Sequence, residues 1–340
     1  MVCFLKMFFS LTTFATAHYL KIILLSGTAL LLSNFMPSGS ENPIKLFDEF
    51  WQIFDDHYAF FELRNVDWEL QKKNFRPKIT TTTSEQELFS IFCQMIDPLD
   101  DGHVSISGKG FFNSNTKPAW LWESGQIQSF ISEQYLHGKI QQRGRITYGL
   151  LDEETGYINI TAMEGFDASD MDEATQALKR VKKVIVDVRF NGGGYDQTAL
   201  ALAGRFTDKK RYVYSKETFC KRAYSDRLDL YISPEGTTLI TVKLVVLTSR
   251  ATASAAEMFV MAMKAIPNAV IIGENTAGMH SDVYSVTLSN GWRLGLSNQK
   301  YVLPDGKVYE KTGLPPDITI PMNDILILKK DLILEKAKTL

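Results

Sequence analysis

The run ATASAAE, residues 251–257, places a serine where a nucleophile would have little steric cover. It separates an apolar, strand-like stretch that ends at Thr248 from an apolar, helix-like stretch over 258–266. Ser254 lies among residues with almost no bulk, as in a chain that something approaches closely. Its hydroxyl has two uses, as a nucleophile in covalent catalysis or as a cap on the next helix. The run itself leaves both interpretations open.

A second run of small residues, Gly192–Gly194, follows the apolar stretch 184–188. Glycine has no Cβ, so its backbone N–H can face a ligand at close range. The N-terminus of the helix after Ser254 would add further N–H groups and a partial positive charge. Such donors together form an oxyanion hole for acyl transfer. The alternative is a tight turn, but three consecutive glycines exceed what a turn needs, which favours the functional interpretation.

A nucleophilic serine needs a base, and the chain has five histidines. His103 is the best placed, because it follows the acidic turn 100–102 and enters an alternating, strand-like stretch that holds a side chain firmly. His280 is close to Ser254 in sequence, but it follows a loop that we expect to be mobile. The other three fall in the leader, on an aromatic-rich helix and in a polar loop: His18, His57 and His137.

These groups require an α/β fold to bring them together. The pattern predicts strands at 156–160, 184–188, 242–247 and 269–272, a helix at 169–183, and a hairpin with a two-residue turn across 284–297. Residues 103–145 are expected to be rich in loops. Ligands of open α/β sheets gather at the carboxyl ends of the strands. The triple glycine and Ser254 both follow such ends.

The part of the chain before the α/β pattern is expected to be helical. Apolar residues recur at steps of three and four from Ile44 to Phe54, and Ser84 with Glu87 resembles a capping box for a helix that runs to Met95. The predicted organisation is a leader over 1–36, a linker over 37–43, a helical subdomain over 44–100, a core over 101–325 and a C-terminal helix over 326–340.

Composition excludes some classes of partner. The 340 residues are 45% hydrophobic and 22% charged, enough to bury a large core. A formal net charge of -2 gives no basic field, so we expect no nucleic-acid partner. The sequence has no CxxC, HExxH or Cys/His cluster with metal spacing, so we expect no metal and no cofactor. A disulfide between Cys93 and Cys220 is left open.

The first forty residues predict export. Apolar stretches at 7–17 and 22–32 follow single lysines and are each shorter than the ~20 residues of a membrane span. They resemble a secretory leader, cleaved or retained as a membrane anchor. The alternative is a buried N-terminal helix.

The ordered motifs of the chain resemble those of a serine peptidase family, the C-terminal processing (tail-specific) peptidases and the tricorn core protease. Four segments, between about residues 44 and 320, carry the resemblance: LDDGHVSI (99–106), VIVDVRFNGGG (184–194), LTSRATASAAE (247–257), and the pair GENTAGM (273–279) and YEKTGLPPDI (309–318). The resemblance implies a crotonase-like (ClpP/crotonase) α/β core with a helical N-terminal portion, acting on a peptide or protein substrate.

The resemblance is to the tricorn-like branch of that family. The processing branch uses a Ser-Lys dyad, and Met279 stands where its lysine would be. The tricorn-like branch implies Ser254 as nucleophile and His103 as general base. It also implies Glu310 as the carboxylate that orients His103, directly or through a polar neighbour.

Further features follow from the same resemblance. The N–H groups of Gly193 and Ala255 are implied as the oxyanion hole. The glycine that donates is Gly193 or one of its two neighbours. An inserted PDZ-type module is not expected, because the stretch to about residue 145 is too short for one. One departure is Gly102, since the tricorn protease has a serine just before the histidine. A supporting hydrogen bond is then absent or replaced.

Two rival functions stay open. The first is a non-catalytic protein for apolar ligands, as in the retinoid-binding protein of the photoreceptor matrix, which contains related domains. An apolar cleft near Phe190, Met279 and Trp292 would suit it. The second is an inactive peptidase-like scaffold, which the departure at Gly102 would explain. The complete serine, histidine and glutamate set favours a serine peptidase.

Overall fold

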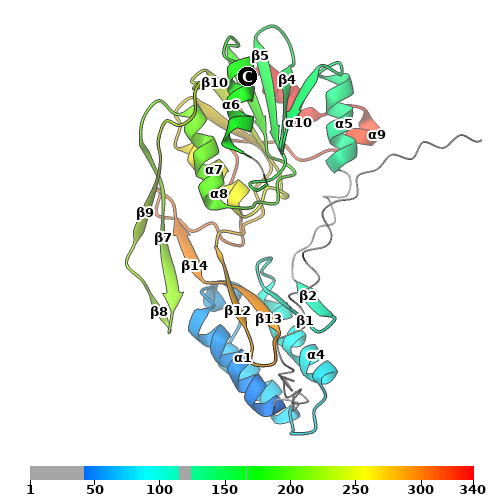
Figure 1. The fold of residues 1–340 in the computed structure, drawn as a ribbon, viewed down its shortest axis with the longest axis vertical. Helices are drawn as coiled ribbons and strands as arrows, with labels where there is room; N and C mark the ends of the chain where they lie inside the picture. Colours follow the sequence, from blue (N-terminus) through cyan, green and yellow to red (C-terminus); the bar gives the residue numbers. More distant parts are fainter. Residues whose placement is uncertain (1–41, 115–123, 166) are drawn as a thin grey trace, which may run out of the picture. The chain divides into compact units, whose positions relative to one another are not determined.

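The computed structural model describes residues 42–114, 124–165 and 167–340 (Figure 1). The predicted leader and its membrane association lie outside the described residues. The described chain begins with helix α1 (Pro43–His57), which Asn42 caps. The apolar residues of this helix are buried on one face. Helix α4 (Glu85–Ile96) begins with the predicted Ser84–Glu87 capping box, which is confirmed. Short helices lie between and after them: α2 (Phe61–Arg64), α3 (Trp68–Phe75), η1 (Arg76–Lys78) and η2 (Asp97–Leu99).

A four-stranded antiparallel sheet packs on these helices. Its order is β12-β13-β1-β2, with β1 (Ser105–Gly108), β2 (Phe111–Ser114), β12 (Val283–Thr287) and β13 (Arg293–Ser297). Trp292 from the C-terminal half packs edge-on against Phe89 and Phe92 of α4. The predicted hairpin is confirmed, but the loop between its last pair, Thr287 and Arg293, is longer than two residues. The helical segment and the β12–β13 hairpin therefore share one core.

A seven-stranded sheet forms the centre of the α/β part (Figure 1). Its order is β15-β11-β10-β6-β5-β4-β3, and the five strands from β15 to β5 are parallel. The strands are β3 (Ile140–Arg143), β4 (Ile146–Leu150), β5 (Thr155–Ile160), β6 (Lys183–Asp187), β10 (Lys243–Thr248), β11 (Ala269–Gly273) and β15 (Ile318–Thr319). The four predicted strands are confirmed to within a residue. Their continuous apolar runs reflect burial on both faces.

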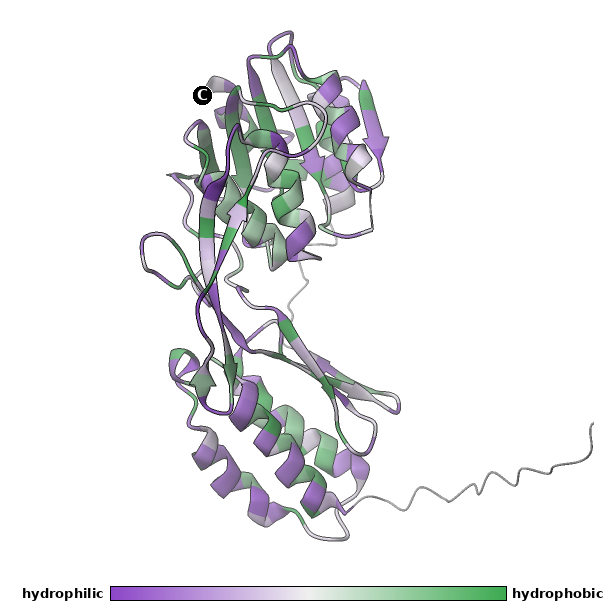
Figure 2. Cartoon of the chain, turned by 60° about the vertical axis from the view of Figure 1, so that its left-hand side comes forward, coloured by the Kyte–Doolittle hydropathy of each residue, from purple (hydrophilic) through white to green (hydrophobic). Residues whose placement is uncertain are grey.

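Helices cover both faces of this sheet. One face packs on α6 (Ala168–Ala177), α7 (Asp196–Ala203) and α8 (Ala255–Lys264), and the other on α5 (Ser124–Gln134), α9 (Ile325–Leu328) and α10 (Leu332–Thr339). Figure 2 shows hydrophobic residues along the central strands of this sheet and mixed colours along the helices. The prediction of a helix to residue 183 was wrong, since α6 ends at Ala177, and the predicted C-terminal helix is two short ones.

Several elements were not predicted. A third sheet contains β7 (Arg211–Cys220), β8 (Ala223–Tyr224), β9 (Leu228–Ile232) and β14 (Gln299–Val302), and a turn of helix, η3 (Gly204–Phe206), precedes it. The stretch expected to be loops holds β1, β2, α5 and β3. Cys93 is half-buried and Cys220 exposed, and both are free thiols, so the disulfide left open does not form. Every helix within the described ranges is too short or too polar to cross a lipid bilayer.

Candidate active site

Ser254 lies where the chain leaves β10 and enters α8. Its backbone has φ 53° and ψ -129°, a conformation that residues with a side chain rarely adopt. Such strain costs about 1–3 kcal/mol and persists only where the surroundings hold it, most often at functional sites. The Ser254 N–H donates to Glu257 Oε2 (3.1 Å), and the Glu257 N–H donates to the Ser254 carbonyl (2.7 Å). The backbone N–H and carbonyl of Ser254 thus cap the first turn of α8.

The hydroxyl of Ser254 instead faces His103. His103 Nε2 lies 3.2 Å from Ser254 Oγ, within hydrogen-bond distance. His103 comes from the turn before β1 and is only 9% exposed. Burial lowers the pKa of His103, and the neighbouring Asp101 carboxylate opposes this shift without cancelling it. A neutral imidazole in this position can take the proton of a serine hydroxyl.

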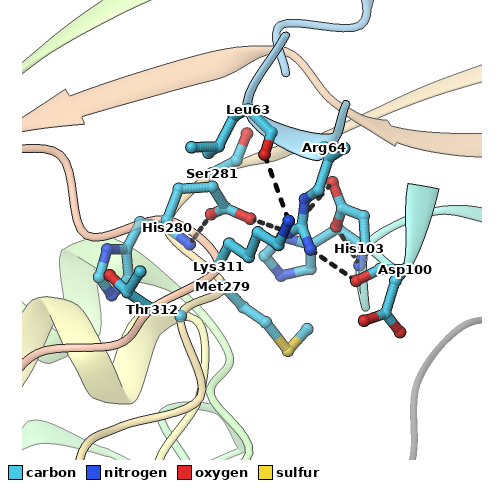
Figure 3. Close-up of polar contacts among 12 residues, drawn as sticks. Leu63, Arg64, Asp100, His103, Met279, His280, Ser281, Lys311 and Thr312 are labelled. Carbon is cyan, nitrogen blue, oxygen red and sulfur yellow. Dashed lines mark hydrogen bonds and ion pairs between the residues drawn. The ribbon is translucent and has the colours of Figure 1, made fainter. Parts of the chain in front are cut away.

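Asp101 fixes the turn that carries His103. Its Oδ1 accepts from the His103 N–H (2.9 Å) and its Oδ2 accepts from the Tyr58 hydroxyl (2.9 Å). Arg64 donates through Nη1 to the Asp100 carbonyl (2.6 Å), and its Nη2 lies 4.0 Å from Asp101 Oδ2 (Figure 3). Two side chains from the N-terminal helices therefore hold the turn of the candidate base.

Glu310 lies against Arg64 rather than against His103. Its Oε1 accepts from Arg64 Nη2 (2.5 Å) and its Oε2 accepts from the His280 N–H (2.6 Å). His103 Nδ1 is buried without a hydrogen-bond partner among the described residues. Of the two expected arrangements, a direct contact between Glu310 and His103 is absent among the described residues, and Glu310 is linked to the turn of His103 through Arg64 and Asp101. Burial raises the pKa of Glu310 to about 7; Asp101 adds to this rise, while His280 and Arg64 oppose it.

His280 is fully buried, so the expectation of a mobile loop was wrong. Its Nε2 lies 2.7 Å from Glu257 Oε1. The Glu257 carboxylate also accepts from the N–H groups of Ser254, Gly278 and Met279. Burial favours the neutral forms, but mutual attraction prevails and raises the pKa of His280 while lowering the pKa of Glu257. His280 is thus occupied as the partner of Glu257.

Gly193 packs directly against Ser254. A Cβ at Gly193 would lie 2.7 Å from Ser254 Cβ, and its φ of 107° suits glycine. Its N–H donates to Asn191 Oδ1 (2.9 Å), so one of the two predicted oxyanion donors is already bonded. The other, the Ala255 N–H at the start of α8, has no acceptor among the described residues. It is available to a ligand.

The residues that would line an apolar cleft in the rival ligand-binding protein do not share one hydrophobic cluster. Phe190 belongs to the cluster under α5 and α10, whereas Trp292 belongs to the cluster of the N-terminal helices. A cavity of about 270 Å³ lies elsewhere, between α5 and strands β3–β5. Neither Phe190, Met279 nor Trp292 lines it, and neither do Ser254 and His103. Within the ranges that the structure covers, no group of His, Cys, Asp and Glu side chains is arranged to hold a metal ion.

Part of this site gave little or no sequence signal. Tyr58 and Arg64 lie 43 and 36 residues before the acidic residues they bind, in a stretch whose pattern indicates only packing. Glu257 carried a weak signal, since an acidic residue three places after Ser254 is typical of a capping box. Asp101 lay inside the quoted LDDGHVSI motif without an assigned role.

Comparisons with known proteins agree with the motifs. The model of peptidase family S41 matches residues 154–320, and the model of the tricorn protease C1 domain matches residues 42–97. The carboxy-terminal processing protease CtpA of Bacillus subtilis (strain 168) is 27% identical over 175 residues, which cover 51% of this chain and 36% of that protein. The chain therefore matches about a third of the length of this curated relative.

Solved structures share the fold over most of the chain. A peptidase-like protein from Parabacteroides merdae ATCC 43184 superposes with a TM-score of 0.77 at 25% identity, covering 88% of this chain and 96% of that one. The photosystem II D1 C-terminal processing protease superposes with a TM-score of 0.58 at 17% identity, covering 82% and 93%. The family model and the relative CtpA thus assign residues 154–320 to peptidase family S41, and the solved structures show that the chain shares a fold with them.

Proposed function

We propose that this chain is a serine peptidase that hydrolyses peptide bonds with Ser254 as nucleophile and His103 as general base. The observation that carries the proposal is the 3.2 Å approach of His103 Nε2 to the hydroxyl of a serine in a strained backbone conformation. A helix cap needs neither the strain nor a buried histidine beside the hydroxyl.

The proposed reaction has two halves. Ser254 Oγ attacks the peptide carbonyl carbon, and its proton passes to His103 Nε2. The C–N bond of the tetrahedral intermediate then breaks, and His103 returns the proton to the leaving amine. In the second half, water gives a proton to His103 as its oxygen attacks the acyl-enzyme carbonyl carbon. The ester C–O bond then breaks, the carboxylic acid leaves, and His103 returns the proton to Ser254 Oγ.

The oxyanion of the intermediate needs donors that are not already used. The Ala255 N–H, at the positive end of α8, supports one donor of the proposed hole. The Gly193 N–H is proposed as the second, and here an incoming oxyanion must share or displace Asn191 Oδ1. Loss of one such donor costs about 3 kcal/mol of transition-state stabilisation.

The finer assignments are proposals of the same kind. The match to the tricorn C1 domain model and the absence of a lysine at Met279 support the tricorn-like branch, with a crotonase-like core and no PDZ-type module. We infer a peptide or protein substrate, and the name of the relative CtpA favours processing at a carboxy terminus. The apolar stretches 7–17 and 22–32 support export. Glu310 is proposed to act on His103 only through Arg64 and Asp101.

Fluorophosphonate labelling of the purified chain tests the proposal. Wild type should label, and Ser254→Ala and His103→Ala should not, while Ser90→Ala on the exposed face of α4 should label like wild type. Cleavage of a peptide library then defines the substrate. A folded wild type that does not label would overturn the peptidase assignment in favour of an inactive scaffold.

A further inference from the structure

Arg64 is a buried cation at the junction of the N-terminal helices with the turn that carries His103. Its side chain is 4% exposed, and it ends helix α2. One arm of the guanidinium donates to a main-chain carbonyl, that of Asp100, and the other to the carboxylate of Glu310 (Figure 3). A planar guanidinium holds two such acceptors in fixed directions, which a lysine cannot do.

The turn that Arg64 grips is conformationally demanding. Asp100 has φ 45° and ψ 41°, in the left-handed region that side-chain-bearing residues rarely occupy. The next residue, Asp101, anchors the His103 N–H, and the Tyr58 hydroxyl anchors Asp101. The direction of the His103 ring therefore depends on contacts that originate in the N-terminal helices.

Arg64 also closes a ring of polar contacts around the candidate nucleophile and base. The ring runs through Ser254, His103, Asp101, Arg64, Glu310, His280 and Glu257 and returns to the Ser254 N–H. Arg64 is the member of this ring whose charge does not titrate in the ordinary pH range. It faces the two carboxylates, Asp101 and Glu310, that would otherwise carry uncompensated charge.

We propose that Arg64 is a positioning residue, which aims His103 at Ser254 by holding the Asp100–Asp101 turn and Glu310 together. The N-terminal helical segment thereby supplies, through Arg64, a residue that positions the candidate base. This inference rests on the proposed peptidase function. A purely structural role would require only that a cation be paired with the buried carboxylates, and the Arg64→Lys variant would still supply that positive charge.

The charges around His103 fix what a pH profile should show. Those that act on the ring are Asp101, Glu257 and Asp282, which favour its protonated form, and His280, which disfavours it. Arg64→Met removes the cation beside Asp101. The carboxylate then favours protonated His103 more strongly, so the acid limb of the rate profile should move to higher pH.

The test is the fluorophosphonate labelling rate of the full chain measured against pH. Arg64→Met should lower the rate by on the order of 100-fold, the effect of a small misplacement of reacting groups, and raise the acid midpoint. Arg64→Lys keeps the charge but cannot donate to the Asp100 carbonyl and to Glu310 in fixed directions at once. Its labelling rate should therefore fall about 10-fold, with the acid midpoint unchanged. Arg76→Met, which removes a surface partner of Asp48 in the same segment, should match wild type in both.

Circular dichroism gives the folded fraction to which each rate is normalised. A wild-type rate in either Arg64 variant overturns the inference, and so does a loss in Arg64→Met with an unmoved midpoint. If Arg64→Met does not fold, Arg64→Lys alone decides: a loss supports the inference and a wild-type rate overturns it. If the wild type does not label at all, the peptidase proposal fails and the inference fails with it. Labelling of wild type with unaffected Arg64 variants overturns only the inference.

Discussion

Gly102 packs closely against the side chain of Met279, next to the candidate base His103. A Cβ on Gly102 would lie 2.6 Å from Met279 Cε and 2.8 Å from its Sδ. By the resemblance described above, these are the two positions where a departure from the two branches of the family is expected, with glycine for the serine before the histidine and methionine for the dyad lysine. A side chain at 102 requires the end of Met279 to move.

The first prediction is that substitutions at these two positions are energetically coupled. Gly102→Ala should destabilise the fold by about 1 kcal/mol, at the low end for overpacking because a methionine end is flexible. Met279→Ala should remove that penalty in the double variant. Urea unfolding of the four proteins measures the coupling. The control is Gly125→Ala, where an added Cβ meets no atom within 4 Å, and its effect on stability should be independent of Met279→Ala. If the effects of Gly102→Ala and Met279→Ala simply add, the predicted coupling is wrong.

Adjacent glycines allow a matched comparison at the candidate oxyanion loop. Gly193→Ala should lower the labelling rate at least 100-fold, because its Cβ would overlap Ser254 Cβ and its φ of 107° disfavours any side chain. Gly192→Ala should label like wild type, since a Cβ there meets nothing within 4 Å. Rates normalised to folded protein make the comparison. Equal rates in the two variants would show that the contact of Gly193 with Ser254 is not needed.

The elements that place the candidate nucleophile could be predicted because their signals are local. A buried strand, a run of small residues and a helix follow one another within 25 residues of chain, and each has its own pattern. The direction of the Ser254 hydroxyl could not be predicted, because a helix cap and a strained nucleophile give the same residue type at the same place. The difference lies in tertiary contacts with His103.

The links behind the base could not be predicted for a related reason. Arg64 contacts Asp100 and Glu310 across 36 and 246 residues of chain, and nothing in its local pattern distinguishes it from a surface arginine. The resemblance to the family led to the expectation that Glu310 would orient His103, directly or through a polar neighbour. The structure places Arg64 between them, which sequence spacing has no means to reveal.

Glu257 is predicted to be essential to the shape of the nucleophile turn. Glu257→Gln should destabilise the protein by about 3–5 kcal/mol, since it breaks the buried ion pair with His280. The Glu257 carboxylate accepts hydrogen bonds from the backbone N–H groups of Ser254, Gly278 and Met279. The amide of Gln has only one oxygen to accept them, and its NH₂ group would face backbone donors. Thermal and urea unfolding measure the loss. Glu85→Gln, at an exposed pair with Lys109, should change stability by less than about 1 kcal/mol.

Glu310 is predicted to make stability depend on pH in a defined direction. Its pKa rises from an ordinary 4.5 to about 7 in the folded chain, through burial first and the Asp101 charge second. A group with a raised folded pKa contributes stability that is complete below its unfolded pKa and is lost as the pH rises through its folded pKa. The stability of wild type relative to Glu310→Gln should therefore fall between about pH 4.5 and 7. The lowered pKa of His103 acts in the opposite direction, since it costs stability in acid, but it is common to both proteins and largely cancels in the difference. Calorimetric unfolding of the pair at several pH values measures this difference, and a difference that does not fall over this range would mean that the pKa of Glu310 is not raised in the folded chain.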